Sequence, residues 1–255
     1  MKALLKTDFR RLRKNKLVYV LLILAFVLPA ISTSMLYYLM LFLGEGDLGL
    51  LPALASEHYM QSFSLLNNIG LMTMIFVTLI VAKDFSEFTI RNKIIAGYSR
   101  IQIYFSVLII NLALALMAIF LSSTTTYVIA LFFEGFDKAV FLDVLKFGVI
   151  GYTSIAVLFT FNTLLIFKYK KASGAMLLTI GVLFIILIFS GVVDVLGTLN
   201  DREPQFVYYT FPIIRLLSLT GKNVPEWYFA LLANAVHLGY LIPLSVLYAK
   251  KTDFK

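Results

Sequence analysis

Residues 103–133 read IYFSVLIINLALALMAIFLSSTTTYVIALFF, a run of 31 residues without a single charged side chain. A bilayer core about 30 Å thick is crossed by about 20 apolar residues of helix. The run therefore predicts a helix that crosses a membrane and is long enough to tilt, kink or project from it.

The same criterion selects five further stretches, none of which contains an acidic residue. They are Leu17–Leu43, Phe63–Ala82, Leu145–Phe167, Ser173–Val193 and Trp227–Ala249, and the run described above is Ile103–Phe133. Pro29 lies inside the first stretch and predicts a kink there. We therefore expect an all-α, polytopic membrane protein with six transmembrane helices, forming one transmembrane domain over residues 1–255.

The composition excludes most other classes of protein. AVILMFWYC residues make up 60% of the chain and charged residues only 14%, whereas a soluble domain carries roughly a quarter charged residues. An ordinary soluble enzyme and a disordered chain are both excluded. The absence of cysteine excludes a disulfide scaffold and thiolate metal sites. The two histidines, His58 and His237, lie far apart in sequence, which argues against a histidine-based metal site.

The basic residues predict the orientation of the chain. The segments 1–16, 83–102, 168–172 and 250–255 together hold 17 of the 22 Lys and Arg residues. Because basic connections stay on the cytoplasmic side, we expect a multi-pass protein of the cell membrane with both termini in the cytoplasm.

Residues 1–16 are expected to form an amphipathic helix at the membrane interface. On a helical projection one arc collects Met1, Leu4, Leu5, Phe9 and Leu12. Basic residues occupy the remaining circle, which suits contact with anionic lipid headgroups. Asp8 falls inside the apolar arc and weakens the pattern, and a plain basic tail is the alternative interpretation.

The connection 83–102 is longer than a hairpin requires and has helix signals of its own. Gly97 suits the left-handed conformation that ends a helix, and Ser99 with Gln102 forms a Ser-x-x-Gln capping box for the next span. A short helix over about 85–96 is therefore predicted. Its apolar residues beside Arg91 and Lys93 suit docking into the groove of a partner protein. Packing against the chain's own spans is the alternative.

Residues 87–100, EFTIRNKIIAGYSR, resemble the signature between the second and third spans of ABC-2 type transporter permeases. That family typically shows an acidic residue, then Gly-Thr-Ile-Arg-Asn-Lys, then Gly-x-Ser-Arg. This chain matches Thr89–Lys93, Gly97, Ser99 and Arg100, and has Phe88 where the family often has Gly. The basic N-terminal helix, the six spans, the long last outer connection and the short basic tail also resemble the family.

The resemblance implies that residues 85–96 are a cytoplasmic coupling helix received by a cleft of an ABC ATPase subunit. Polar contacts there would come from Glu87, Arg91 and Lys93, and the apolar residues would seat the helix. The full set of coupling residues is Phe85, Glu87, Phe88, Thr89, Ile90, Arg91, Asn92, Lys93 and Ile94. The N-terminal helix would correspond to the family's elbow or connecting helix. A second permease chain, identical or related, would complete the pore.

No chemistry of its own is expected of this chain. It lacks the G-x-x-x-x-G-K-[ST], H-E-x-x-H and G-x-S-x-G motifs, so we predict a transport subunit rather than an enzyme. We expect no cofactor on this chain, with ATP and Mg²⁺ on the partner ATPase, and no nucleic-acid partner. The predicted function is export of an amphipathic peptide or a hydrophobic drug. The alternatives are a non-transporting immunity or sensor protein for an antimicrobial peptide and a self-sufficient secondary carrier.

Polar residues inside the spans allow two interpretations. They could line a translocation path, in which case the candidates are Asn111, Ser123, Thr126, Asn162, Asn234 and His237. They could instead hydrogen-bond between helices, which we favour because a buried polar group needs a partner in lipid. The last outer connection, 194–226, is too apolar for a free loop and is expected to return to the membrane surface as broken, re-entrant or interfacial helices.

Overall fold

The computed structural model describes residues 1–43, 58–60, 62–63, 68–87, 89–136, 138–199 and 227–251. Over these residues the protein is all-helical, without a strand. Its named elements are α1 (Lys2–Leu12), α2 (Lys16–Leu43), α4 (Asn68–Ser86), α5 (Thr89–Ile95), α6 (Arg100–Glu134), α7 (Lys138–Tyr169), α8 (Ala172–Leu199) and α11 (Trp227–Lys251). The predicted all-α class is confirmed.

Four helices among the described residues are long and apolar enough to cross a membrane. The qualifying segments are Lys16–Leu39, Arg100–Phe133, Phe141–Tyr169 and Trp227–Lys251. They coincide with four of the six predicted spans, so the chain is a membrane-embedded protein. The second and fifth predicted spans overlap α4 and α8. That these two helices also cross the membrane stays a prediction.

Several predicted boundaries differ from the observed ones. Phe63 lies in a turn rather than at the start of the second span, and α4 begins only at Asn68. The same helix continues through Phe85 to Ser86. The fifth span was predicted to end at Val193, but α8 continues to Leu199. Residues 200–226, where broken outer helices are predicted, lie outside the described residues, and so does Phe88.

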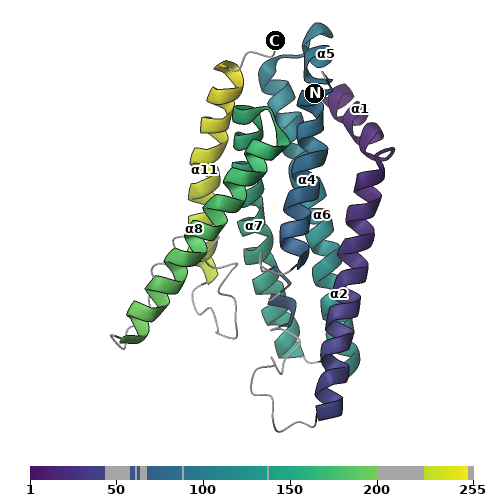
Figure 1. Cartoon of the computed structure of the whole chain (residues 1–255), viewed down its shortest axis with the longest axis vertical. Coiled ribbons are helices and arrows are strands. Elements are labelled where there is room, and N and C mark those ends of the chain that lie inside the picture. Colours follow the sequence, from purple (N-terminus) through teal and green to yellow (C-terminus); the bar gives the residue numbers. More distant parts are fainter. Residues whose placement is uncertain are drawn as a thin grey trace.

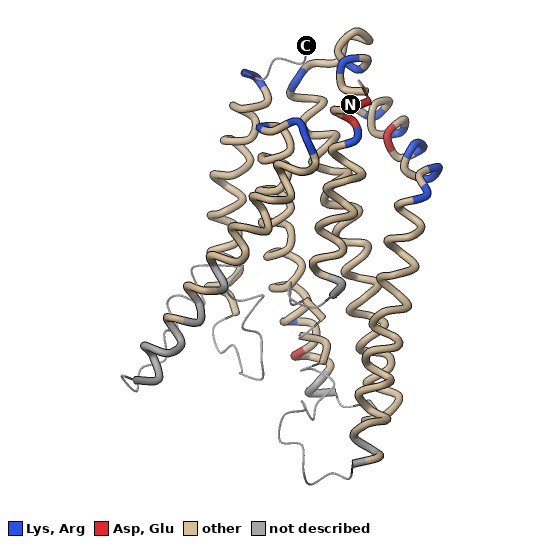
Figure 2. The backbone as a smooth tube through the Cα atoms, viewed as in Figure 1, with Lys and Arg blue, Asp and Glu red and all other residues tan. Residues whose placement is uncertain are grey.

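The long helices run beside one another as a bundle (Figure 1), with α2 against α4 and α6, and with α7 against α6, α8 and α11. The guanidinium of Arg100 donates to the carbonyl of Lys250 at 2.7 Å, which joins the start of α6 to the end of α11. Lys and Arg gather at this end of the bundle (Figure 2). We call it the basic end, and it holds α1, α5, the first turn of α6 and the last turn of α11.

One face of α1 is buried against the protein's own helices rather than turned to the membrane surface. Leu4, Asp8 and Leu12, spaced four residues apart along one helix face, are buried. Phe9, which was predicted to share the apolar arc, is instead 42% exposed. The acidic residue that weakened the predicted pattern is thus central to the buried face of the helix.

Candidate functional site

The connection between α4 and α6 is shaped by local chemistry at both ends of its bend. Gly97 has a φ of 87°, the left-handed conformation expected of it, and the amide of Tyr98 donates to the carbonyl of Lys93 across this turn. The amide of Gln102 donates to the Ser99 hydroxyl at 3.3 Å, and the Ser99 amide donates to the Gln102 side chain at 3.1 Å. Ser99 and Gln102 therefore form the predicted capping box.

The single helix predicted over 85–96 is divided in two, which corrects its boundaries. Phe85 and Ser86 are the last residues of α4, Glu87 lies in a turn, and α5 is a separate seven-residue helix from Thr89 to Ile95. The ring of Phe85 packs edge-on against Phe167 of α7, with ring centroids 5.1 Å apart. Phe85 is therefore part of the helix bundle rather than of the short helix.

Only one side of α5 faces outward. Ile90 and Lys93 are buried, with exposed fractions of 2% and 7%, and Ile94 packs against the hydrophobic core. Arg91 and Asn92 are exposed, and Ile95 is 74% exposed. Most of the apolar residues predicted to seat a partner thus contact the chain's own helices. We call Arg91, Asn92 and Ile95 the α5 outer face.

Sequence reasoning missed Ile95, which is the apolar residue of the α5 outer face. Its position follows from helix geometry, because residues four apart share a face and Ile95 lies four residues after Arg91. Glu87 is also exposed, and its carboxylate lies 3.1 Å from the ammonium of Lys83. Thr89 is half-buried.

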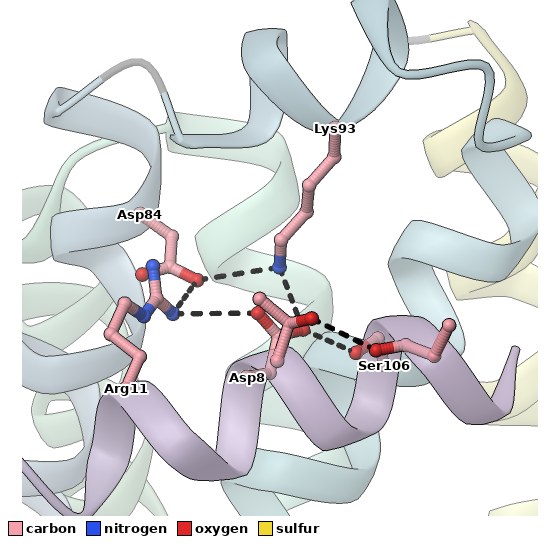
Figure 3. A network of polar contacts seen from close by, with 7 residues as sticks. Asp8, Arg11, Asp84, Lys93 and Ser106 are labelled. Atoms are coloured by element: carbon pink, nitrogen blue, oxygen red, sulfur yellow. Dashed lines mark hydrogen bonds and ion pairs between the residues drawn. The ribbon is translucent and has the colours of Figure 1, made fainter.

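Lys93 is directed into the protein, where it joins a network of buried charges (Figure 3). Its ammonium donates to Asp8 Oδ2 at 2.8 Å, and the same oxygen accepts from the Ser106 hydroxyl at 2.6 Å. Asp84 Oδ2 lies 3.8 Å from the Lys93 ammonium and 2.5 Å from Arg11 Nη2. These five residues, which we call the charge cluster, join α1, α4, α5 and α6.

The charge cluster holds two carboxylates and two cations, so each buried charge has an opposite charge beside it. Asp8 is 2% exposed and Ser106 fully buried, whereas Arg11 is 37% exposed at its side chain. Burial raises the pKa of Asp84, although the hydrogen bond and charge of Arg11 and the charge of Lys93 oppose this. The lost hydration of that carboxylate, together with the negative charge of Asp8, therefore outweighs its ion pairs. A paired cluster of this kind can fix the relative position of four helices.

Sequence reasoning also missed Asp8, Arg11, Asp84 and Ser106. The available signal was the position of Asp8 inside an apolar arc, since an acidic residue on a buried helix face needs a cationic partner. The sequence does not say which of the chain's cations that partner is. Among the described residues no group of three or more His, Cys, Asp or Glu side chains could hold a metal ion.

Three of the candidate path residues are asparagines that hydrogen-bond to other helices. Asn111 of α6 donates to the Phe159 carbonyl of α7 at 2.9 Å. Asn162 of α7 donates to Thr179 of α8 at 3.1 Å and accepts from Thr78 of α4 at 3.3 Å. Asn234 of α11 donates to Thr153 and Ser154 of α7 at 2.7 and 3.0 Å. Each bond joins α7 to a neighbour, which fits the interhelical interpretation.

The other candidate path residues divide between helix contacts and local contacts. The Ser123 hydroxyl lies 2.9 Å from the Tyr152 hydroxyl, again between α6 and α7. Thr126 is buried. The ring of His237 is 2.7 Å from the carbonyl of Ala233 in its own helix, so this contact does not link two helices.

Comparisons of the chain with protein-family models, with curated proteins and with solved structures gave no match. The resemblance of residues 87–100 to ABC-2 permeases therefore stays a prediction. The candidate site therefore consists of the α5 outer face and the charge cluster behind it, both of which lie at the basic end.

Proposed function

We propose that this chain is the membrane-spanning permease subunit of an ATP-binding-cassette exporter and is driven by a separate ATPase subunit. The observation that carries the proposal is the separate helix α5, which leaves Arg91, Asn92 and Ile95 exposed while buried ion pairs hold its other side. A short helix with an apolar residue and a cation on its free face suits a groove in a partner protein. The resemblance of residues 87–100 supports the same assignment.

In this proposal α5 transmits motion from the ATPase to the bundle. The charge cluster joins α5 to α1, α4 and α6, so a displacement of α5 also displaces the helices on which the bundle depends. ATP-driven closure of the ATPase shifts the population of permease conformations only if the ATPase binds α5 differently in the two states. No covalent chemistry is assigned to the permease.

The proposal includes an orientation, a partner chain and a class of substrate. The basic end lies in the cytoplasm, as the positive-inside rule requires, and all six predicted spans cross the cell membrane. A second copy of the chain or a related permease completes the pore. The substrate is an amphipathic peptide or a hydrophobic drug.

The test is whether the tagged chain co-purifies from its own membranes with an ATP-binding-cassette ATPase. Arg91→Glu combined with Ile95→Glu should abolish co-purification and substrate-stimulated ATPase activity while membrane insertion is retained. Lys171→Glu reverses another exposed charge, at the hairpin between α7 and α8, and should leave both co-purification and ATPase stimulation intact. Lys93 is left unchanged because it is buried in the charge cluster.

Two results would contradict the proposal. A chain that purifies alone and moves solute in vesicles without any ATPase would be a secondary carrier. A chain that binds an antimicrobial peptide, confers resistance and moves nothing across the membrane would be an immunity protein. Unchanged co-purification and activity of the double variant would remove the α5 outer face from the coupling mechanism.

A further inference from the structure

His58, Tyr59, Met60, Ser62 and Phe63 lie in the half of the bundle opposite to the basic end, and their exposed fractions are between 1% and 8%. We call these residues the plug segment. The sequence analysis assigned only Phe63 of this segment to the second predicted span, and the structure places it in a turn.

The plug segment lies between three long helices and contacts each through aromatic rings. The ring of His58 is 5.1 Å from that of Tyr37 in α2. Tyr59 meets Tyr127 of α6 edge-on at 5.7 Å, and Phe63 meets Tyr152 of α7 edge-on at 5.0 Å. Tyr37 and Tyr127 lie late in α2 and α6, and Tyr152 lies near the middle of α7. The plug segment is therefore far from α1 and α5.

Two glycines of α7 form the seat of the plug segment. A Cβ atom added to Gly148 would lie 2.8 Å from the Tyr59 hydroxyl oxygen. A Cβ atom added to Gly151 would lie 2.5 Å from Phe63 Cδ1 and 2.7 Å from Phe63 Cγ. Separations this short are steric overlap, so the side chains of the plug segment occupy the volume that any larger residue would need at these positions.

Two backbone amides of the plug segment form their hydrogen bonds within the segment. The amide of Ser62 donates to the carbonyls of His58 and Tyr59, and the amide of Phe63 donates to the carbonyl of Met60. The Ser62 hydroxyl donates to the Tyr59 carbonyl at 2.6 Å. Because these bonds are internal, the plug segment can leave its seat without leaving these backbone groups unpaired in the membrane. The contacts described above that hold it to the long helices are made by its side chains.

We propose that the plug segment is a gate that closes the outer end of the bundle by seating Phe63 and Tyr59 against Gly151 and Gly148. Opening withdraws the two rings from between α2, α6 and α7. The long helices then need no large rearrangement at that end. This inference rests on the proposed function, because a gate serves a protein that moves a substrate across the membrane.

A disulfide tests whether the gate must open. Phe63 Cγ is one bond from its Cβ, so Cβ atoms at positions 63 and 151 would lie no more than about 4 Å apart, within disulfide range. Because the natural chain has no cysteine, Phe63→Cys combined with Gly151→Cys gives a single possible intramolecular disulfide. Oxidation should abolish export and reduction should restore it. The two single-cysteine variants, treated with the same oxidant, should be unaffected by it. Export that continues unchanged in fully cross-linked protein would overturn the proposal.

A labelling experiment tests the seat without any transport or ATPase. In intact cells, Ser62→Cys should resist a membrane-impermeant maleimide when no other change is present. Adding Gly151→Leu fills the seat and should make the thiol reactive, and adding Phe63→Ala to that pair should restore protection. If the Gly151→Leu protein does not accumulate, Phe63→Ala combined with Ser62→Cys alone replaces it. This pair loosens the plug segment without adding volume, and the thiol should become reactive.

The outcomes separate the gate from the proposed function. Two control variants are labelled in the same way. Phe136→Cys gives an accessible thiol, because Phe136 is 69% exposed at the same end as the plug segment. Arg91→Cys at the basic end gives an inaccessible thiol in intact cells. Ser62→Cys that reacts equally in every background, or that stays protected when the seat is filled, would overturn the gate. If the seat results hold but the chain exports nothing with its ATPase, the proposed function fails while the seated plug segment stands.

Discussion

At the scale of single residues, Asp8 joins three other members of the charge cluster. One of its oxygens accepts from Lys93 and from Ser106, and its other oxygen lies 3.9 Å from Arg11. A carboxylate buried to this degree is tolerated only when its partners replace the lost hydration. Removing it leaves Lys93 buried with only Asp84, whose nearest oxygen is 3.8 Å away.

Asp8→Ala should therefore lower the free energy of unfolding by about 3–5 kcal/mol, the cost of leaving a buried partner unpaired. Chemical denaturation in detergent micelles measures the change. The matched control is Asp143→Ala, because Asp143 pairs with Lys146 at 3.1 Å while both side chains are well exposed. The control should lose less than about 1 kcal/mol. Asp8→Leu with Lys93→Met should lose less than Asp8→Ala, and equal losses would argue against a buried ion pair.

The raised pKa of Asp84 predicts that the stability of the protein depends on pH. Burial raises its pKa above the ordinary value of 3.8, so the folded protein binds this proton more readily than the unfolded chain. The contribution of Asp84 to the free energy of unfolding therefore rises as the pH falls through the raised pKa and is complete below 3.8. Denaturation of the natural chain and of Asp84→Asn across this range should show a stability difference that shifts in favour of the natural chain on acidification. A shift in the opposite direction would contradict the assignment.

At the scale of elements, the bend between α5 and α6 depends on Gly97. Its φ of 87° is costly for residues that carry a Cβ atom. Gly97→Ala should lower the free energy of unfolding by roughly 1 kcal/mol. Gly181→Ala in α8 is the control, since a Cβ atom there meets nothing within 4 Å, and it should be neutral or stabilising. Equal losses for the two variants would show that the left-handed conformation is not what Gly97 provides.

The same connection shows what a sequence can and cannot predict for an element. The end of α5 and the start of α6 were predictable because Gly97, Ser99 and Gln102 act on backbone groups within a few residues of themselves. The buried side of α5 was not, because Lys93 is turned inward by Asp8, which lies 85 residues away in the chain. A helix of seven residues has too few positions for its own pattern to indicate which face is buried.

At the scale of the whole molecule, hydrophobic length and charge predicted the all-α membrane class and four of the spans. They could not predict that α4 begins after the plug segment, because Phe63 is as apolar as the helix that follows. The plug segment fits there because Gly148 and Gly151 lack side chains, and this fit exists only once α7 lies beside Tyr59 and Phe63 in the folded protein.

Both long-range features, the charge cluster and the plug segment, thus depend on contacts between distant parts of the chain.

Cysteine mapping tests the proposed orientation of the whole bundle. Arg91→Cys and Lys171→Cys, both at exposed positions, should react with a membrane-impermeant maleimide only after the cells are permeabilised. Phe136→Cys should react in intact cells, because α6 separates it from Arg91. The reverse pattern would invert the orientation. Reaction of Arg91→Cys and Lys171→Cys on opposite faces of the membrane would contradict the six-span arrangement.

The link between Asp8 and Lys93 also sets an order of events during synthesis. Ribosomes add roughly 5–20 residues per second, so the 85 residues between the two require several seconds or more at that rate. During this interval α1 has left the ribosome while its lysine partner does not yet exist. The nascent chain must therefore keep Asp8 hydrated at the membrane surface, and α1 docks only after α5 and α6 have followed it out.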